Sequence, residues 1–429
     1  MKQLLYKFGL AFKSVDIRFI LLICVLLTLP ALEALKNLFS ILFVISWVIL
    51  AKRNNDWGGN WRVIDSIFLL WILADIFVSI NAVITHQFSG AGFRDIIRFV
   101  LIGWVVSRIR FSREQLTQSA IFALVATVLT LIYSYYAGEG NLVELYSVGH
   151  INHTAIYLII CYVISLSLLL FNFNHLNSYQ KPLVLLTTIV FFLTTLDAGS
   201  RATSGLLVII TIFSFLYFLI KVKKLTLALG CIGGIFSAII LSAQHPVYEL
   251  KKIQQQISQF QDLSHILDDS AREKIYRFSY HAFKTNPFFG VGFGNFGQIQ
   301  IEDIRASIIK DKKVFNGQFY TGSAHAHNVY FNYLVSGGLL AFSIFAWFWL
   351  YTLWIIIKHV VLNNIKLYKA KFPENEWILL SSIGVFFVNI GIGFVNTTLH
   401  HEHAILSMFV LGLLIGQYRI IESVEELSG

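Results

Sequence analysis

The sequence contains few charged residues. Asp, Glu, Lys and Arg make up 13% of the 429 residues, hydrophobic residues make up 56%, and mean hydropathy is +0.68. Soluble domains carry about 25% charged residues, so this composition excludes a soluble fold. A membrane-spanning helix needs roughly 20 apolar residues, and the apolar runs predict an all-α polytopic membrane protein with about twelve transmembrane helices. The predicted spans are 17–35, 36–51, 64–85, 94–107, 115–137, 152–171, 183–198, 203–220, 225–243, 328–357, 377–397 and 402–418.

Cysteine is also scarce, and no internal repeat is visible. Cys24, Cys161 and Cys231 all fall inside predicted spans, so the sequence indicates neither a disulfide framework nor a cysteine metal cluster. The missing repeat disfavours an inverted-repeat transporter. A transporter or flippase would also need ionisable residues along a path through the membrane, and the predicted spans carry very few. A polytopic transporter or flippase is therefore the alternative from a different functional class.

Basic residues are nearly absent from every second connection between spans. They gather in the others: Lys2, Lys7 and Lys13; Lys52, Arg53 and Arg62; Arg108, Arg110 and Arg113; Lys221, Lys223 and Lys224; Lys358, Lys366, Lys369 and Lys371. The positive-inside rule therefore predicts cytoplasmic termini. The formal charge of +9 reflects this topology, and we expect no nucleic-acid partner.

One long polar segment interrupts the apolar runs and divides the chain. Residues 1–243 carry the first nine predicted spans, 244–327 form a loop domain on the outer face, and 328–429 carry the last three spans and a cytoplasmic tail. A segment of this length either docks on the membrane or builds a structure outside it.

Two helices are predicted in this loop, over Tyr248–Leu267 and Asp269–Lys284. The second follows Asp268-Asp269-Ser270, which supplies an N-cap, and stops before Asn286-Pro287. Gly290-Val291-Gly292-Phe293-Gly294 then follows a helix, whereas a phosphate-binding loop precedes one. A tight turn is therefore favoured over a phosphate site.

Arginines on the outer face are the first candidates for chemistry. Arg201 lies between two spans where the positive-inside rule disfavours arginine, and an arginine at membrane depth usually has a function. The alternatives are an interfacial side chain or an ion pair with Asp197. In the second loop helix, Arg272 shares a face with Tyr276, while Arg277 is interpreted as part of a solvated basic face.

His327 is the sharpest candidate for a base. It precedes the span that Asn328 opens, and the partial positive charge of a helix N-terminus favours a neutral imidazole that accepts a proton at pH 7. A histidine that only caps the helix is the alternative. His325, two residues earlier, is a weaker competitor.

The spacing of the other outer histidines decides whether they are candidate metal ligands. His150 and His153 form one group, and His400-His401-Glu402-His403 forms another. Metal pairs on helices prefer i, i+3 or i, i+4 spacing, which His400 and His403 meet only where a span begins. No Asp-x-Asp or dense carboxylate cluster is present on the outer face for Mg²⁺. We therefore expect metal-free chemistry, with His153 lining the pocket and the other histidines interfacial.

The outer face thus offers guanidinium groups and a base. Arginine matches phosphate oxygens with paired donors, so the set suits a lipid diphosphate. The base would deprotonate an acceptor hydroxyl while the arginines stabilise the leaving charge. Glycosyl transfer from a polyprenyl-diphosphate sugar fits this description.

Three stretches resemble the O-antigen ligase and polymerase superfamily of bacterial envelope glycosyltransferases, as do the predicted topology and the late periplasmic loop. They are Gly199-Ser200-Arg201-Ala202-Thr203-Ser204-Gly205; Ser270-Ala271-Arg272-Glu273-Lys274-Ile275-Tyr276 with Asn286-Pro287-Phe288-Phe289-Gly290-Val291-Gly292; and His327-Asn328-Val329-Tyr330 with Gly337-Gly338-Leu339-Leu340. The motif likeness covers about residues 195–345. Tyr276 is a departure, because the family's loop helix is expected to carry Trp there.

The resemblance implies a C-type glycosyltransferase-like fold in the inner membrane of a Gram-negative bacterium, with the active site on the periplasmic face. It implies inverting transfer without metal or other cofactor, with His327 as base and Arg201 and Arg272 on the diphosphate. Secondary substrate contacts are expected from His153, His325, Asn328, Tyr276 and Arg277.

Two expected partners follow from the favoured activity, which is O-antigen ligation. They are an undecaprenyl-diphosphate-linked glycan as donor and lipid A-core as acceptor, within a membrane of other lipids. A polymerase that joins repeat units on undecaprenyl diphosphate needs the same residues and is the first alternative. A protein O-oligosaccharyltransferase is the second.

Overall fold

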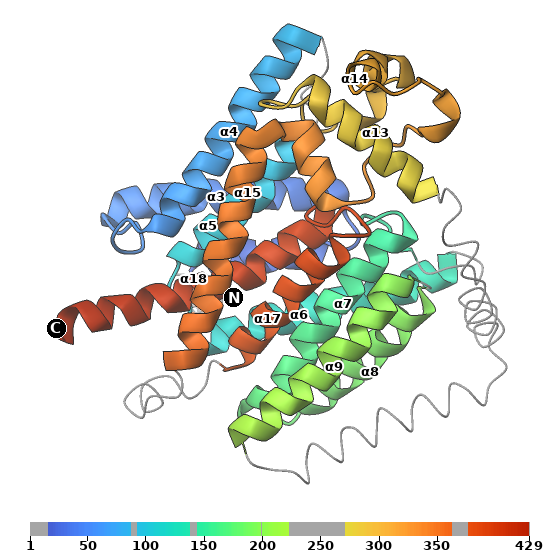
Figure 1. The fold of residues 1–429 in the computed structure, drawn as a ribbon. Helices are drawn as coiled ribbons and strands as arrows, with labels where there is room; N and C mark the ends of the chain where they lie inside the picture. The colour runs from blue at the N-terminus through green and yellow to red at the C-terminus, as the bar shows by residue number, and fades with distance from the viewer. Residues whose placement is uncertain are drawn as a thin grey trace, which may run out of the picture.

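The computed structural model describes residues 16–86, 92–137, 144–198, 200–222, 271–362 and 376–428. These residues form helices and loops without a strand, which confirms an all-α polytopic membrane protein (Figure 1). The helices are α2 (Ile17–Thr28), α3 (Glu33–Asn54), α4 (Val63–His86), α5 (Phe93–Arg108), α6 (Arg113–Ala137), α7 (Ile151–Ser167), a π-helical turn (Leu168–Asn172), a 3₁₀ turn (Phe173–His175), α8 (Gln180–Asp197), α9 (Arg201–Val222), α13 (Ala271–Thr285), 3₁₀ turns (Phe296–Gln298, Ile301–Ile304), α14 (Arg305–Lys310), a 3₁₀ turn (Gly317–Phe319), α15 (Val329–Leu362), α17 (Glu376–Ile392) and α18 (His401–Ser428).

Eight of the described helices are long and apolar enough to cross a membrane: α3, α4, α6, α7 with its π and 3₁₀ turns, α8, α9, α15 and α18. Two apolar helices, α2 and α17, are shorter, and α5 coincides with the predicted span 94–107. The predicted span 225–243 and the first predicted loop helix lie outside the described residues.

The first predicted boundary is wrong. The expected span 17–35 ends as a helix at Thr28, and the next helix begins at Glu33 rather than at residue 36. Pro30 lies between them, and proline cannot continue a helix because it lacks the backbone N–H. Lys36 therefore lies within α3, where it is buried.

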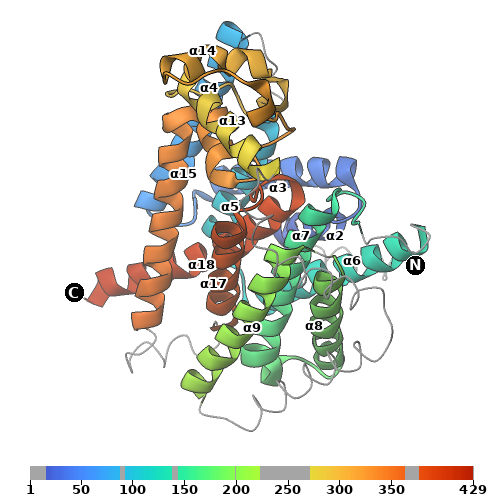
Figure 2. The ribbon, with the colours of Figure 1, turned by 45° about the vertical axis from the view of Figure 1, so that its right-hand side comes forward.

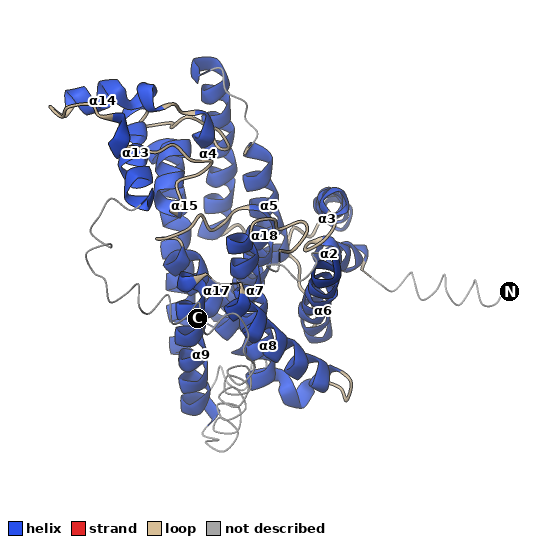
Figure 3. Cartoon of the chain, turned by 90° about the vertical axis from the view of Figure 1, so that its right-hand side faces the viewer, coloured by secondary structure: helices blue, strands red, loops and turns tan. Residues whose placement is uncertain are grey.

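The helices pack around a core that α5, α7 and α18 share. Helices α5 and α18 lie side by side, and α7 packs against α8 and α17. Helices α3 and α18 run across the direction of α15 (Figure 1), and α3 and α13 lie on opposite sides of α5 (Figure 3). Most of the buried apolar side chains belong to this one cluster.

A second, smaller apolar core belongs to the loop that includes α13 and α14. It contains Phe278, Phe296 and Ile308, together with Val335 from α15. The loop sits beside the start of α15 and the end of α4 (Figures 1 and 2). Helix α13 begins within two residues of its predicted start, which confirms the second predicted loop helix.

The predicted tight turn is confirmed, and its glycines make a close approach to α15. The amides of Val291 and Gly292 donate to carbonyls of Val335 and Ser336, at 2.9 and 2.8 Å. Gly338 interrupts α15 with φ 61° and ψ −165°. There the Leu339 N–H donates to the Pro287 carbonyl at 2.8 Å. These backbone groups of the loop therefore form hydrogen bonds with α15 and are not directed at an anion.

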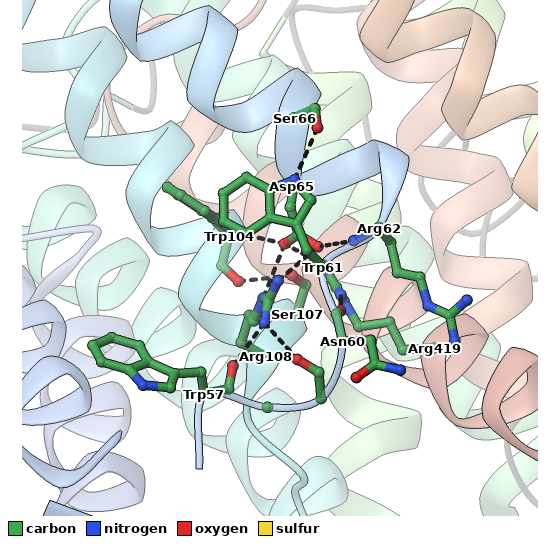
Figure 4. A network of polar contacts seen from close by, with 12 residues as sticks. Trp57, Asn60, Trp61, Arg62, Asp65, Ser66, Trp104, Ser107, Arg108 and Arg419 are labelled. Atoms are coloured by element: carbon green, nitrogen blue, oxygen red, sulfur yellow. Dashed lines mark hydrogen bonds and ion pairs between the residues drawn. The ribbon is translucent and has the colours of Figure 1, made fainter. Parts of the chain in front are cut away.

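A charged network holds the far ends of α4, α5 and α18. The fully buried Asp65 carboxylate accepts from Arg108 Nε at 2.9 Å, from Arg419 at 2.5 Å and from the Trp104 indole at 2.7 Å, and it forms an ion pair with Arg108 Nη2 at 2.7 Å (Figure 4). Asp95 lies thirteen residues before Arg108 on α5, about 20 Å away at 1.5 Å per residue. The network therefore marks the end of the bundle opposite Asp95.

Candidate active site

His327 lies immediately before the first turn of α15. The Asn328 side-chain oxygen accepts from the amides of Tyr330 at 2.9 Å and Phe331 at 3.0 Å, so Asn328 is the N-cap that starts the helix. His327 has φ 49°, a left-handed conformation that is uncommon for residues other than glycine and recurs at functional sites. Its predicted place at a helix N-terminus is confirmed.

Helix α13 brings Tyr276 and Arg272 to this point. The Tyr276 hydroxyl lies 3.0 Å from the carbonyl oxygen of Phe394 and 3.3 Å from that of His327. The Asn328 amide nitrogen also donates to the Phe394 carbonyl, at 3.0 Å. Arg272, one helical turn before Tyr276, is exposed, and its charge acts on both Tyr276 and His327. The structure thus brings Arg272, Tyr276, His327 and Asn328 together.

The imidazoles of His327 and His325 are held neutral. Burial lowers the pKa of His327 from its usual 6.5, and the charges of Arg272 and His150 lower it further. Burial, His327 and His150 lower the pKa of His325 to about 4. The two ring centroids are 4.3 Å apart. Both rings can accept a proton at pH 7, and His327 is the one next to the guanidinium of Arg272.

Arg201 is the first residue of α9 and is exposed. The hydroxyl of Thr203 donates to that of Ser200 at 2.9 Å across this helix start. Leu206, one and a half turns further on, comes within 3.8 Å of the position that a Cβ on Gly391 would occupy. Since α17 ends at Ile392, just before Phe394, Arg201 lies at the same end of the bundle as His327. Its contact with a diphosphate stays a prediction.

Arg277 makes the contacts of a surface residue. Its guanidinium pairs with Glu273 at 2.6 Å and lies 5.9 Å from the ring centroid of Phe319. Both partners of the ion pair are partly exposed. These contacts agree with the interpretation of a solvated basic face, and a substrate contact by Arg277 stays a prediction.

The outer histidines meet in one cluster, which the sequence did not predict. Around the buried ring of His153, five histidine ring centroids lie at 5.2 Å (His403), 5.6 Å (His400), 5.8 Å (His325), 6.2 Å (His401) and 6.5 Å (His150). We call these six residues and His327 the histidine cluster. The expectation that His403 is interfacial is wrong, because its side chain is fully buried and stacks on His153.

Three residues of this region are placed close enough to ligate a metal. One ligand atom from each of Asp95, His400 and His401 lies within 4.8 Å of the others. Arg98 forms an ion pair with one oxygen of the Asp95 carboxylate, and the other oxygen lies 3.5 Å from His401 Nδ1. Metal-free chemistry stays a prediction.

Two cavities adjoin the histidine cluster and share Asp95 and His401. The inner cavity, of about 240 Å³, is lined by His325, His400, Tyr333 and neighbouring side chains. The lateral cavity, of about 570 Å³, lies between α3 and α5. Beside them a buried Lys36 forms an ion pair with Glu402, and Ser147 joins both at 3.0 and 2.9 Å. A lysine and a glutamate at the ends of apolar runs were the only sequence signal for this pair.

The segment that carries the predicted site residues has a match among known families. The model of a family described as O-antigen ligase matches residues 183–346, a stretch that includes Arg201, Arg272 and His327. No curated protein matches the sequence.

Proposed function

We propose, for a chain whose residues 183–346 match the model of a family described as O-antigen ligase, that this membrane protein is an O-antigen ligase. It transfers the glycan from undecaprenyl diphosphate to lipid A-core oligosaccharide. The observation that supports this most directly is the neutral His327, fixed at the start of α15 beside Arg272. The reaction site is at the periplasmic face of the inner membrane, and the alternation of basic loops supports that orientation.

The reaction is a single displacement at the anomeric carbon of the donor sugar. An acceptor hydroxyl oxygen forms the new bond to this carbon, and the bond from the carbon to the diphosphate oxygen breaks. The bonding electron pair leaves with undecaprenyl diphosphate, and the hydroxyl proton passes to the His327 imidazole. Attack opposite the leaving group inverts the anomeric configuration, and no covalent enzyme intermediate forms.

Arg201 and Arg272 bind the diphosphate and stabilise the charge that it gains. Guanidinium groups offer two parallel donors to phosphate oxygens, and preorganised donors at a developing charge lower the barrier. The Tyr276 and Asn328 side chains hold the backbone around Phe394 and so fix α13 against the start of α15. A base in the position of His327 contributes about 10²–10⁴ in rate.

Deletion of the gene in its native host tests the reaction. Ligase loss leaves lipopolysaccharide without O-antigen while lipid-linked polymer accumulates. A core capped by one repeat unit instead identifies a polymerase and overturns the proposal.

Complementation of the deletion tests the site. His327→Ala is expected not to restore O-antigen, whereas His175→Ala restores it, because His175 is exposed on a 3₁₀ turn that connects α7 to α8. Equal membrane levels of both variants are the control. Purified protein should keep its activity in a chelator, and a strict metal requirement would contradict the mechanism.

A further inference from the structure

The lateral cavity has one polar end and one apolar end. Arg94, Asp95, Arg98, Glu33 and Asn37 line the polar end. Arg98 pairs with Asp95 and with the Asn37 side chain, but its Nε is buried without a hydrogen-bond partner among the described residues. Arg94 is exposed at the mouth. Guanidinium groups suit phosphate and carboxylates suit sugar hydroxyls, so this end matches a phosphorylated sugar.

The apolar end suits acyl chains. It is formed by isoleucine, valine and leucine side chains of α3 and α5: Ile41, Val44, Ile45, Ile97, Leu101 and Ile102. Ile41 and Ile45 are 59% and 47% exposed, and α3 is a membrane-spanning helix by its length and composition. The apolar end of the cavity is therefore bordered by exposed side chains of a helix that can contact lipid.

The lateral cavity leads towards the base. Asp95 and His401 line both cavities, and His325 lines the inner one. The His325 ring lies 4.3 Å from that of His327. The two cavities are therefore neighbours that meet at Asp95 and His401, and the inner one is separated from His327 by the His325 ring.

Direct displacement separates the acceptor hydroxyl from the diphosphate of the donor. The attacking hydroxyl and the departing diphosphate lie on opposite sides of the anomeric carbon. Helix α13, which carries Arg272, and α3 lie on opposite sides of α5 (Figure 3). A donor held by Arg272 lies on the α13 side of α5, so the α3 side is available to the acceptor.

We propose that the lateral cavity between α3 and α5 binds the acceptor, an acylated glycolipid with a phosphorylated sugar head group. This proposal rests on the proposed function, since it assigns the second lipid of the same reaction. The lipid chains lie along Ile41 and Ile45, and the head group lies at Arg94 and Arg98.

Two variants and two matched controls test the assignment. Ile45→Trp fills the apolar end, and Ile49→Trp is its control, one turn along α3, 58% exposed and outside the cavity lining. Arg94→Ala removes the exposed guanidinium, and Arg305→Ala, an exposed loop residue, is its control. Initial rates are measured with purified full-length protein while acceptor and donor are varied separately.

The expected result is a KM for the acceptor raised about tenfold in both variants. In Ile45→Trp the indole displaces part of a lipid chain, equivalent to one or two buried methylene contacts, and in Arg94→Ala a hydrogen bond to a charged group is lost. The kcat, the donor KM and both controls stay near the wild-type values. An unchanged acceptor KM in both variants, or a raised donor KM instead, overturns the proposal.

Direct binding separates this proposal from the proposed function. Lipid A is titrated against the purified wild-type protein and Ile45→Trp, and bound lipid is counted by native mass spectrometry. Wild-type binding that Ile45→Trp weakens supports the cavity even if no transfer is detected, whereas equal binding by both contradicts it. Absence of transfer by the wild type contradicts the proposed function alone.

Discussion

In the proposed reaction, His327 is a base whose strength depends on its neighbours. Burial and the charge of Arg272 lower its pKa, which keeps the ring unprotonated but also makes it a weaker proton acceptor. A bound diphosphate brings negative charge to Arg272 and offsets the repulsion between the guanidinium and a protonated imidazole. The donor therefore strengthens the base at the moment when it is needed.

The pH dependence of transfer follows from this arrangement. Since the lowered pKa keeps His327 neutral until the pH falls below 6.5, the acid limb of kcat/KM is expected below pH 6.5. The limb of kcat, which reports the enzyme–substrate complex, should lie at higher pH. Arg272→Gln should move the kcat/KM limb upward. Rates of purified enzyme from pH 4.5 to 8 check this, and coincident limbs that Arg272→Gln leaves in place would contradict it.

The proposed binding of the diphosphate by Arg201 and Arg272 depends on paired hydrogen-bond donors and not on charge alone. Arg201→Lys and Arg272→Lys keep the charge but lose the planar fork, and we expect kcat/KM to fall about ten- to hundredfold. Arg305→Lys is the matched control, because its contacts are with Glu302 and Phe315. Equal activity of all three variants would remove Arg201 and Arg272 from the diphosphate.

Between helices, α15 and the loop before it are joined by a backbone contact that leaves no room for a side chain. A Cβ at Gly338 would lie 2.3 Å from the backbone of Phe288, and φ there is 61°. The contact joins residues 287–292, which follow α13, to α15, which follows His327.

Gly338→Ala is accordingly expected to destabilise the protein by about 1–3 kcal/mol, as overpacking does, and to lower kcat. Gly205→Ala, on α9, is the control, because nothing lies within 4 Å of the added Cβ. Thermal unfolding in detergent measures the difference between the two variants. Identical unfolding temperatures would show that the loop yields without cost.

The helices were largely predictable from the sequence, but the contacts between them were not. Apolar runs located the described spans, and Asn286-Pro287 correctly ended α13. The motif order indicated His327 and Arg272. By contrast, His153 and His403 lie 250 residues apart in sequence and touch in space. Helical periodicity reports which face of a helix is buried and carries no information on which distant helix covers it.

Within the described part of the chain, the two ends of the helix bundle carry different groups of polar side chains. The histidine cluster and the two cavities beside it lie at one end, and the Asp65 network (Figure 4) lies at the other. Lys36 and Asp65 are charged side chains within apolar helices, a cost that membranes tolerate where partners are present. The sequence showed these charges but not the partners, because each partner comes from a different helix.

Removal of the Asp65 carboxylate leaves Arg108 and Arg419 buried without their anion. Breaking a buried pair from one side costs about 3–5 kcal/mol, so Asp65→Ala should lower the unfolding temperature strongly and reduce the yield of folded protein. Asp56→Ala, on the exposed loop before α4, should change neither. Wild-type stability in Asp65→Ala would show that the arginines find other anions.

The interruption of α15 at Gly338 has a consequence for biogenesis. Beyond that point Leu339 and Leu340 donate their amides to Pro287 and Phe288, so the helix cannot satisfy its own backbone within the bilayer. Pro287 and Phe288, which accept these hydrogen bonds, precede α15 in the chain and leave the ribosome before it. The start of α15 can therefore complete its backbone hydrogen bonds only after residues 287 and 288 have taken their place beside it.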